Sequence, residues 1–233
     1  MHHLLHRFMH RYGITPRGVI HIGAHTGQEH PIYTACGIHD QVWVEPQPEA
    51  FARLTQNLPD GGKSGRVRAF NVACGPERTI AKMHRVGGNG ESDSLLAPKE
   101  MLQDYANFGF ADRGTLEVPV VPVDELLPEH GLDPAKYNLL SVDVQGYELP
   151  VLRGAEKTLA GIDAIISEIS EREMYEGNTL APQLDAFLAQ HGFIRVISRL
   201  SKRTRHGNAL YLRKTLLKGW PKLMHGLVGT TRR

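Results

Sequence analysis

Short apolar runs alternate with amphipathic stretches along most of this chain. Strands are predicted at Gly18–Ile22, Gln41–Pro46, Arg66–Cys74, Tyr137–Gly146 and Ile162–Ser170, where turn residues bound each apolar run. Helical spacing of apolar residues predicts helices between them, at Gly27–Cys36, Pro48–Leu58, Glu148–Ala160 and Leu180–Phe193. Continuous apolar strands that alternate with helices indicate an α/β fold, with a mostly parallel sheet covered on both faces.

Two stretches depart from this pattern. Gly87–Pro98 is rich in glycine and serine and predicts a loop that can close over a site. Leu116–Leu127 contains Pro119 and Pro122, which predicts an edge or irregular strand followed by a short helix from Asp124. Near the end, Ile194–Ser198 and Asn208–Lys214 predict an antiparallel pair.

These elements predict one domain at 18–213, with short extensions. Residues 1–17 are expected to be a helical or partly disordered extension, and residues 214–233 a basic tail. A length of 233 residues, of which 41% are hydrophobic, is enough for one sizeable core.

The charge is unevenly distributed along the chain. Eleven Lys and Arg residues and no acidic residue follow Asp185, although the formal net charge of the whole chain is only +2. The basic end is therefore expected to contact something anionic. Its mixture of Leu, Trp and Lys is typical of interfacial segments, so peripheral membrane contact stays open beside an anionic acceptor, a partner surface or a helix packed on the domain. Aromatic-rich nucleic-acid motifs are absent, so we do not expect a nucleic-acid partner. An oligomer is left open.

Composition also bears on the location of the protein. No run of eighteen apolar residues is present, and His and Arg interrupt the N-terminal "MHHLLHRFMHRYG" too often for a signal peptide. Cys36 and Cys74 lack metal-type spacing. A cytoplasmic protein, with a peripheral membrane association left open, is expected.

Candidate chemistry gathers where the predicted strands end. In such sheets ligands bind at the carboxyl ends of the strands. Polar groups follow five consecutive strands there, and they are His21 to Gly27, Glu45, Asn71 to Ala73, Asp143 with Gln145, and Glu168. We expect these groups to converge on one cleft.

The first of these stretches, "VIHIGAHTGQE" (19–29), reads as a strand, a glycine turn and a helix. Gly23 and Gly27 allow a sharp turn close to a ligand. Glu45 follows Gly23 by 22 residues, the approximate spacing of the acid that binds ribose hydroxyls in adenosine cofactor sites. The glycine pattern alone is weak evidence, because it is neither G-x-G-x-x-G nor a P-loop.

Taken together, these motifs resemble the FkbM-type S-adenosylmethionine-dependent methyltransferases. The resemblance runs from about Gly18 to Ile197 and is most specific at "NGESDSLL" and "DVQGYELPVLRGA". It implies a class I methyltransferase fold, with a seven-stranded, Rossmann-like, mostly parallel sheet and a reversed last strand. It also implies methyl transfer to a hydroxyl of a sugar, glycan or secondary metabolite.

The resemblance also implies roles for individual residues. Gly23, Ala24 and Gly27 match the loop beside the methionine part of the cofactor, and Glu45, followed by Pro46, matches the ribose-binding acid. Asn71, Val72 and Ala73 match the segment near the adenine. Asp143 and Gln145 match the motif that faces the methyl group and the acceptor, and Ser94 is a contact expected from the loop. His21 departs from the pattern, since many members have Asp there.

Methyl transfer to a hydroxyl requires a base that removes the acceptor proton. Asp143 is favoured, with Glu168 and His25 as alternatives, and a merely structural role for Asp143 stays open. Asp143 and Glu168 could share a divalent cation, but an ion pair at Glu168 is the expected arrangement, and no metal site is predicted. His2, His3, His6 and His10 are expected to be solvated rather than metal-bound.

Two other functions remain open from the sequence. The first is a nicotinamide-dependent oxidoreductase, because Glu45 would serve either cofactor. The second is a non-catalytic S-adenosylmethionine-binding protein that retains the fold.

Overall fold

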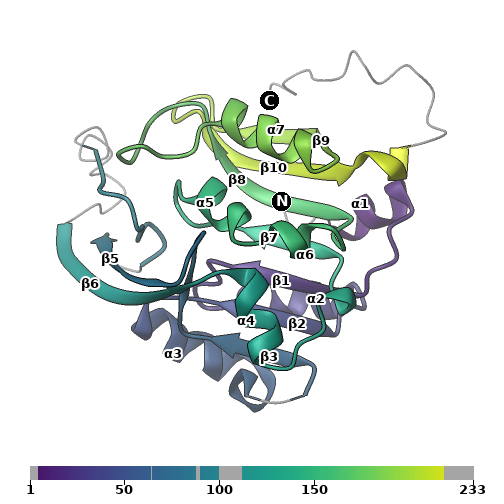
Figure 1. Ribbon diagram of the computed structural model, residues 1–233, viewed down its shortest axis with the longest axis horizontal. Coiled ribbons are helices and arrows are strands. Elements are labelled where there is room, and N and C mark those ends of the chain that lie inside the picture. Colours follow the sequence, from purple (N-terminus) through teal and green to yellow (C-terminus); the bar gives the residue numbers. More distant parts are fainter. Residues whose placement is uncertain (1–4, 64, 88–89, 100–111, 218–233) are drawn as a thin grey trace.

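The computed structural model describes residues 5–63, 65–87, 90–99 and 112–217. A seven-stranded sheet runs through its centre in the order β3-β2-β1-β7-β8-β10-β9 (Figure 1). Its strands are β1 (Gly18–Ile22), β2 (Asp40–Val44), β3 (Val67–Phe70), β7 (Leu139–Val142), β8 (Ala164–Ser170), β9 (Phe193–Leu200) and β10 (His206–Arg213).

The direction of the strands matches the predicted class. The neighbouring pairs from β3 to β8 are parallel, whereas β10 is antiparallel to both β8 and β9. The last strand of the chain is thus inserted in reverse between β8 and β9. This strand order confirms the class I methyltransferase, Rossmann-like fold.

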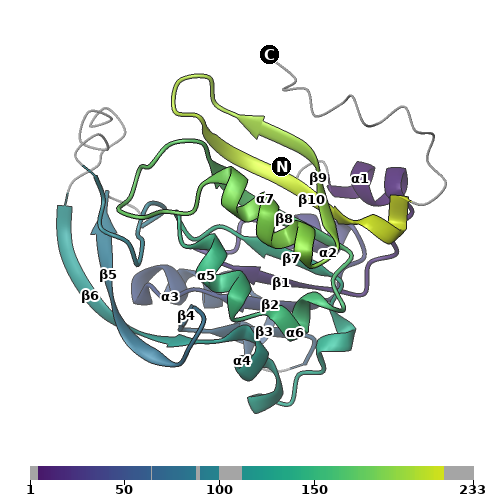
Figure 2. The same ribbon diagram turned by 45° about the horizontal axis from the view of Figure 1, so that its top comes forward.

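Helices cover both faces of this sheet (Figures 1 and 2). One face packs against α1 (Leu5–Tyr12), α2 (His30–Ala35) and α3 (Pro48–Asn57). The other packs against α4 (Val123–Glu129), α5 (Glu148–Arg153), α6 (Glu156–Leu159) and α7 (Ala181–Gln190). Short 3₁₀ helices occur at η2 (Pro59–Gly62), η4 (Pro134–Lys136) and η5 (Lys214–Leu217).

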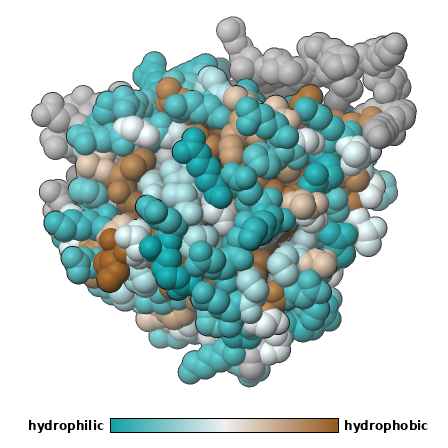
Figure 3. Space-filling view, in the orientation of Figure 1, coloured by the Kyte–Doolittle hydropathy of each residue, from teal (hydrophilic) through white to brown (hydrophobic). Residues whose placement is uncertain are grey.

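The alternation of side chains explains the two apolar cores. Ile20 and Ile22 of β1 belong to the core beneath α4–α7, whereas Val19 belongs to the core beneath α1–α3. Neither core is exposed to solvent, because helices cover both faces of these buried strands. The face seen in Figure 3 is largely hydrophilic, with hydrophobic side chains only in scattered groups. Within the described ranges, no helix has both the length and the apolar character needed to cross a bilayer.

A second, three-stranded sheet with the order β4-β6-β5 lies beside the carboxyl ends of the main sheet. It consists of β4 (Ala73–Cys74), β5 (Thr79–Val86) and β6 (Asp112–Val121). The single strand predicted at Arg66–Cys74 is therefore wrong, because the chain leaves the main sheet after Phe70. Asn71 marks the break, and its side-chain amide donates to the carbonyls of Glu45 and Pro46 at 2.8 and 3.0 Å.

Two other predictions hold only in part. β6 has a single partner at Pro119, as predicted for an edge strand, but it is the central strand of the small sheet at Val120 and Val121. It tolerates Pro119 because β4 pairs only with Val120 and Val121, so the rest of β6 has a single partner. The helix predicted at Glu148–Ala160 is two helices, α5 and α6. The chain turns at Gly154, where an added Cβ would lie 1.9 Å from the Gly75 carbonyl oxygen.

The close backbone contact at Gly23 leads to a prediction about the stability of a variant at this position. Gly23 has a φ of +80°, and an added Cβ would lie 1.7 Å from the carbonyl oxygen of Asp143, whereas Gly37 has a φ of +75° with nothing within 4 Å. Gly37→Ala should cost only the strain of a left-handed alanine, about 1–2 kcal/mol. Gly23→Ala should cost at least about 3 kcal/mol, because β1 and β7 must also separate. Urea unfolding of both variants measures the difference, and equal losses would contradict the importance of this contact.

Candidate active site

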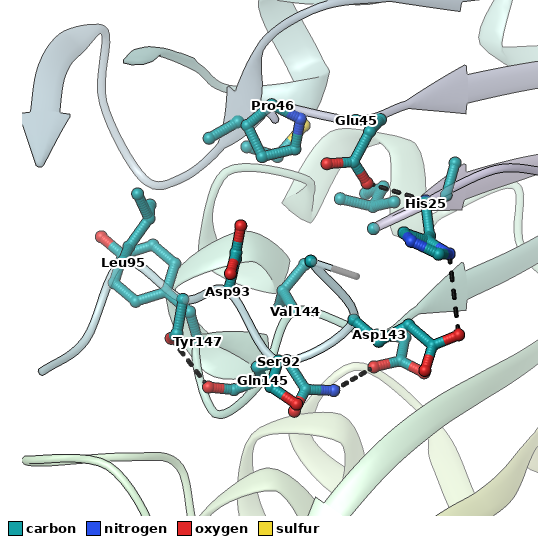
Figure 4. A pocket seen from close by; sticks show the side chains of 18 of the residues that line it. His25, Glu45, Pro46, Ser92, Asp93, Leu95, Asp143, Val144, Gln145 and Tyr147 are labelled. Atoms are coloured by element: carbon teal, nitrogen blue, oxygen red, sulfur yellow. Dashed lines mark hydrogen bonds and ion pairs between the residues drawn. The ribbon is translucent and has the colours of Figure 1, made fainter. Parts of the chain in front are cut away.

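A cleft of about 500 Å³ opens at the carboxyl ends of β1, β2 and β7. This volume is typical of pockets for small molecules and cofactors. Figure 4 shows Glu45 and Pro46 on one side of the cleft and Asp143 and Gln145 on the other. Eleven of the residues predicted from the sequence line it: His21, Gly23, Ala24, His25, Glu45, Pro46, Val72, Ala73, Ser94, Asp143 and Gln145. Gly27, Asn71 and Glu168 do not, and their predicted roles remain predictions.

The turn after β1 is held by its own backbone. The N–H groups of Gly23 and Ala24 donate to the Val44 carbonyl at 2.9 and 3.0 Å, which ties the turn to the end of β2. The Gly27 N–H closes the turn on the Ala24 carbonyl at 2.8 Å. Gly27 faces inward, since an added Cβ would lie 2.7 Å from Leu54 of α3. Bare backbone therefore lines the cleft at Gly23 and Ala24, where a ligand can approach closely.

Glu45 follows β2 and is almost completely buried. One carboxylate oxygen accepts the N–H of His25 at 2.7 Å and the other accepts the N–H of Gln47 at 2.9 Å. Burial raises the pKa of Glu45, although these two hydrogen bonds oppose the rise. Each oxygen retains a lone pair, so the carboxylate is fixed in place and can still accept from a ligand.

The wall beside Glu45 is apolar. Val72, Ala73 and Met83 line the cleft from the small sheet, and Leu95 joins them from the loop. Asn71 lies behind this wall, where it holds the ends of β2 and β3 together through its bonds to Glu45 and Pro46. A flat ring and a hydroxylated ring could thus lie side by side, the first against the apolar wall and the second at Glu45.

At the other end of the cleft, Gln145 separates two carboxylates. Its side-chain nitrogen donates to Asp143 Oδ1 and to Glu168 Oε2, both at 2.9 Å. Its side-chain oxygen lies 3.3 Å from the hydroxyl of Tyr175. Gln145 also has a φ of +52°, a strained value for a residue with a Cβ. Because both N–H groups are committed to acids, Gln145 positions Asp143 rather than offering its amide to a ligand.

His206, the first residue of β10, lines the cleft beside these acids. Its Nε2 lies 2.7 Å from Glu168 Oε1. Burial lowers the pKa of His206, but the charge and hydrogen bond of Glu168, with Asp143 and Glu148 nearby, raise it to about 9. The raised pKa favours the imidazolium form of His206 at neutral pH, and its contact with Glu168 is the kind of ion pair that was expected for Glu168.

Burial also changes the acids themselves. It raises the pKa of Asp143 well above the ordinary value, and the charges of Glu168 and Glu148 raise it further. The pKa of Glu148 rises to about 8 for the same reasons, burial first and Glu168 second. Glu148 does not line the cleft, and its Oε1 accepts the N–H of Gly146 at 2.9 Å. The cluster therefore favours protonation of one acid, and Asp143 is the one that faces the cleft.

His21 contributes little surface to the cleft, because its ring points into the core beneath α1–α3. It stacks on Trp43 with ring centroids 4.9 Å apart, and its Nδ1 lies 3.0 Å from the hydroxyl of Tyr33. Only 2% of the residue is exposed. An aromatic cluster thus occupies the position where an acid was expected, and a direct contact of His21 with a ligand stays a prediction.

His25 lies at the rim of the turn with a φ of +47°. Its Nδ1 lies 3.1 Å from the Gln28 amide nitrogen and 3.9 Å from a carboxylate oxygen of Glu91. Its backbone N–H, rather than its ring, holds Glu45. The ring belongs to the Glu45 side of the cleft, which leaves Asp143 as the better-placed base.

The serine-rich loop is tied down on both sides. Ser94 pairs with His84 of β5 through two backbone hydrogen bonds of 2.7 and 3.1 Å, and its hydroxyl donates to the Gln145 carbonyl at 2.8 Å. The Tyr175 hydroxyl donates to the Ser92 carbonyl at 2.9 Å. Residues 90–95 therefore form a wall of the cleft that is linked to the same Gln145 that separates the acids.

Reasoning from parallel strands missed His206, Asn208 and Asp93, which all line the cleft. His206 and Asn208 lie on the reversed strand, whose first residues meet the carboxyl ends of its neighbours. The strand predicted at Asn208–Lys214 contained Asn208 but began two residues after His206. Asp93 lay inside the predicted loop. No group of three or more His, Cys, Asp or Glu side chains suited to a metal ion occurs among the described residues.

The buried Glu148 leads to a prediction about stability. Its folded pKa of about 8 exceeds the ordinary 4.5, so its contribution to stability is present below about pH 4.5 and is lost as the pH rises through about 8. Glu148→Gln cannot ionise and keeps an acceptor for the Gly146 N–H. The unfolding free energy of the variant, relative to that of the parent, should therefore be higher at about pH 8.5 than at about pH 5. Urea unfolding at both values tests this, and a constant difference would contradict the raised pKa.

Comparison with known proteins gives a family match. The family described as the methyltransferase FkbM domain matches residues 21–195. The chain is 33% identical over 139 residues to the 2-O-methyltransferase NoeI of Sinorhizobium fredii, covering 57% of this chain and 54% of that protein. It is 28% identical over 125 residues to the hexuronic acid methyltransferase AglP of Haloferax volcanii, covering 54% and 45%. The match thus spans about half the length of these curated relatives.

Solved structures are more distant. The magnesium protoporphyrin IX methyltransferase of Synechocystis, with bound S-adenosylmethionine, aligns with a TM-score of 0.48 and 9% identity. The alignment covers 91% of this chain and 77% of that one. The fold assignment therefore rests on the strand order of this chain itself.

Proposed function

Since the chain belongs to the FkbM methyltransferase domain family, we propose that it is an S-adenosylmethionine-dependent O-methyltransferase that acts on a sugar or glycan hydroxyl. The observation that carries the proposal is Glu45, an acid fixed by two backbone N–H groups at the end of β2, in the same cleft as Asp143. Names such as 2-O-methyltransferase and hexuronic acid methyltransferase for the relatives support a sugar as acceptor.

The residues of the cleft suit this cofactor. Glu45 can accept from ribose hydroxyls, the apolar wall with Val72 and Ala73 can hold adenine, and the backbone at Gly23 and Ala24 can approach the amino acid part. When bound, S-adenosylmethionine supplies an electrophilic methyl group. His21 is buried beneath this end of the cleft. Contacts with the amino end would then come from Asp143 or Glu29, both of which line the cleft.

Asp143 would act as the general base. Gln145 occupies its Oδ1 and fixes its direction, so the other oxygen can take the proton of the acceptor hydroxyl as that oxygen becomes methylated. A raised pKa makes the carboxylate a stronger base than an ordinary Asp. His206, positively charged and paired with Glu168, limits the rise and allows Asp143 to ionise.

Two rivals remain distinguishable by binding. A nicotinamide-dependent oxidoreductase would bind NAD in preference to S-adenosylhomocysteine. A non-catalytic binding protein would bind S-adenosylhomocysteine but transfer no methyl group to any sugar in a panel that includes neutral and uronic acid glycosides. Calorimetry with both ligands decides the first question, and lack of S-adenosylhomocysteine binding at sub-millimolar concentration would overturn our proposal.

The membrane contact and the cytoplasmic location stay predictions. The structure uses several basic residues after Asp185 internally: Arg195 pairs with Asp185, Arg205 pairs with Glu171, and Arg213 donates to the Ile162 carbonyl. Part of the excess positive charge after Asp185 is therefore used in contacts within the fold. Most of the predicted tail, from residue 218 onward, lies outside the described residues.

Separate roles for Glu45 and Asp143 predict different kinetic effects. Glu45→Gln should weaken S-adenosylhomocysteine binding by about 10- to 100-fold, the usual effect of losing charge-assisted hydrogen bonds. Asp143→Asn should lower kcat by about 100- to 10,000-fold, because a general base contributes that much, with a smaller effect on binding. Calorimetry and steady-state rates on the same preparations check the division, and equal binding losses would contradict it.

The charges around Asp143 predict how two variants change the pH profile. The reaction needs ionised Asp143, so kcat/KM should fall on the acid side at a pH well above the ordinary Asp pKa of 3.8. Glu148→Gln should leave this limb in place if it lies below about pH 8, where Glu148 is protonated, and should move it to lower pH if it lies higher, because the variant then removes a like charge. His206→Gln removes an opposite charge and should move it to higher pH. Shifts in the same direction would exclude Asp143 as the titrating base.

A further inference from the structure

Asp93 places a second carboxylate in the cleft, and one of its oxygens has no partner. Oδ1 accepts the N–H of Val86 at 2.7 Å. Oδ2 is fully buried yet makes no hydrogen bond to any described residue. An unsatisfied buried acceptor is costly, more so when charged, and proteins seldom leave one without a use. Arg85 makes no hydrogen bond to it: one terminal guanidinium nitrogen lies 3.1 Å from Glu49 Oε1, and Arg85 Nε is itself buried without a hydrogen-bond partner among the described residues.

The unpartnered oxygen lies on the Glu45 side of the cleft. Gly90, with a φ of +85°, lies beside both this oxygen and the Gln47 side chain. A Cβ added at Gly90 would lie 3.6 Å from Asp93 Oδ2 and 3.5 Å from Gln47 Nε2. Gln47 is the residue whose N–H donates to Glu45. The charge of Asp93 also helps to raise the pKa of Glu45. In Figure 4 the Asp93 carboxylate points from the loop toward Pro46 and Glu45. The two acids therefore face a common space.

The position of Asp93 is set by its neighbours. Val86 of β5 holds one carboxylate oxygen, and the next residue, Ser94, is held by His84 and by the Gln145 carbonyl. The side chain cannot easily turn away from the cleft without breaking these bonds. A preorganised acceptor of this kind binds a donor with little loss of entropy.

The chemistry of the two acids selects the ligand group. Two carboxylates facing one space need hydrogen-bond donors, and a vicinal diol provides two O–H groups. Adenine presents acceptors at its ring nitrogens and a single donor group, its exocyclic amine, whereas a ribose presents two adjacent O–H donors to two acids. Resting on the proposed function, we propose that Asp93 is a second ribose-binding acid, which accepts through Oδ2 a hydrogen bond from one hydroxyl of the cofactor while Glu45 accepts from the other.

Calorimetry with S-adenosylhomocysteine tests this without any turnover. Asp93→Ala should weaken binding by about 10- to 100-fold and Asp93→Asn by less, because the amide keeps an oxygen acceptor. Glu117→Gln, which alters an exposed acid of the same small sheet, is the matched control and should bind like the parent. Parent-like binding by Asp93→Ala would overturn the proposal.

The 2′-deoxy and 3′-deoxy analogues of S-adenosylhomocysteine separate a direct contact from a structural effect. One of the two deletions should weaken binding to the parent, and the same deletion should cost Asp93→Ala and Asp93→Asn clearly less. Glu45→Gln should show the matching loss of sensitivity for the other hydroxyl. If both analogues cost the Asp93 variants as much as the parent, Asp93 only shapes the loop and the proposal fails. If the parent itself binds no S-adenosylhomocysteine, the proposed function fails instead.

Discussion

The site depends on one close approach of backbone, between the turn after β1 and the end of β7. Gly23 lies against the Asp143 carbonyl with no room for a Cβ, and its N–H bonds to Val44. The Asp143 N–H in turn donates to the Ile22 carbonyl at 3.0 Å. These contacts bring the ends of three strands to one point. The distance between Glu45 and Asp143 is therefore set by the sheet, whatever fills the space between them.

The electrostatics of the cleft follow from this crowding. The ends of β7 and β8 and the start of α5 bring Asp143, Glu168 and Glu148 together, and burial raises the pKa of Asp143 and of Glu148. Two devices make the cluster tolerable. The Gln145 amide donates to two of the acids, and His206 supplies one positive charge. Burying like charges together thus raises the pKa of Asp143, which is how carboxylates commonly come to titrate closer to neutral pH.

The sequence was informative wherever function depends on parallel strands. Apolar runs located β1, β2, β7 and β8, and polar residues after β1, β2 and β7 line the cleft, whereas Glu168 near the end of β8 does not. It was less informative where a tertiary contact decides the outcome. Nothing local showed that Asn71 would end β3 by bonding across to Glu45, or that a short strand at Ala73–Cys74 would pair with the end of β6 just after Pro119. Polar residues at the ends of strands did not point to His206, because a reversed strand brings its first residues, not its last, to the carboxyl edge of the sheet. The orientation of His21 depended on partners at Tyr33 and Trp43, which are distant in sequence.

His21 shows that the effects of one residue beside the cleft reach into the core of the protein. Its imidazole fills a slot between the indole of Trp43 and the phenol of Tyr33, so these three side chains form one unit. A carboxylate in that slot would be buried against an aromatic face without the stacking that the imidazole provides. The choice between imidazole and acid is therefore made jointly at three positions, one on each of β1, α2 and β2. An acid introduced at position 21 alone would therefore remove the ring that joins Trp43 to Tyr33, and its cost would fall on the core beneath α1–α3 as well as on the cleft.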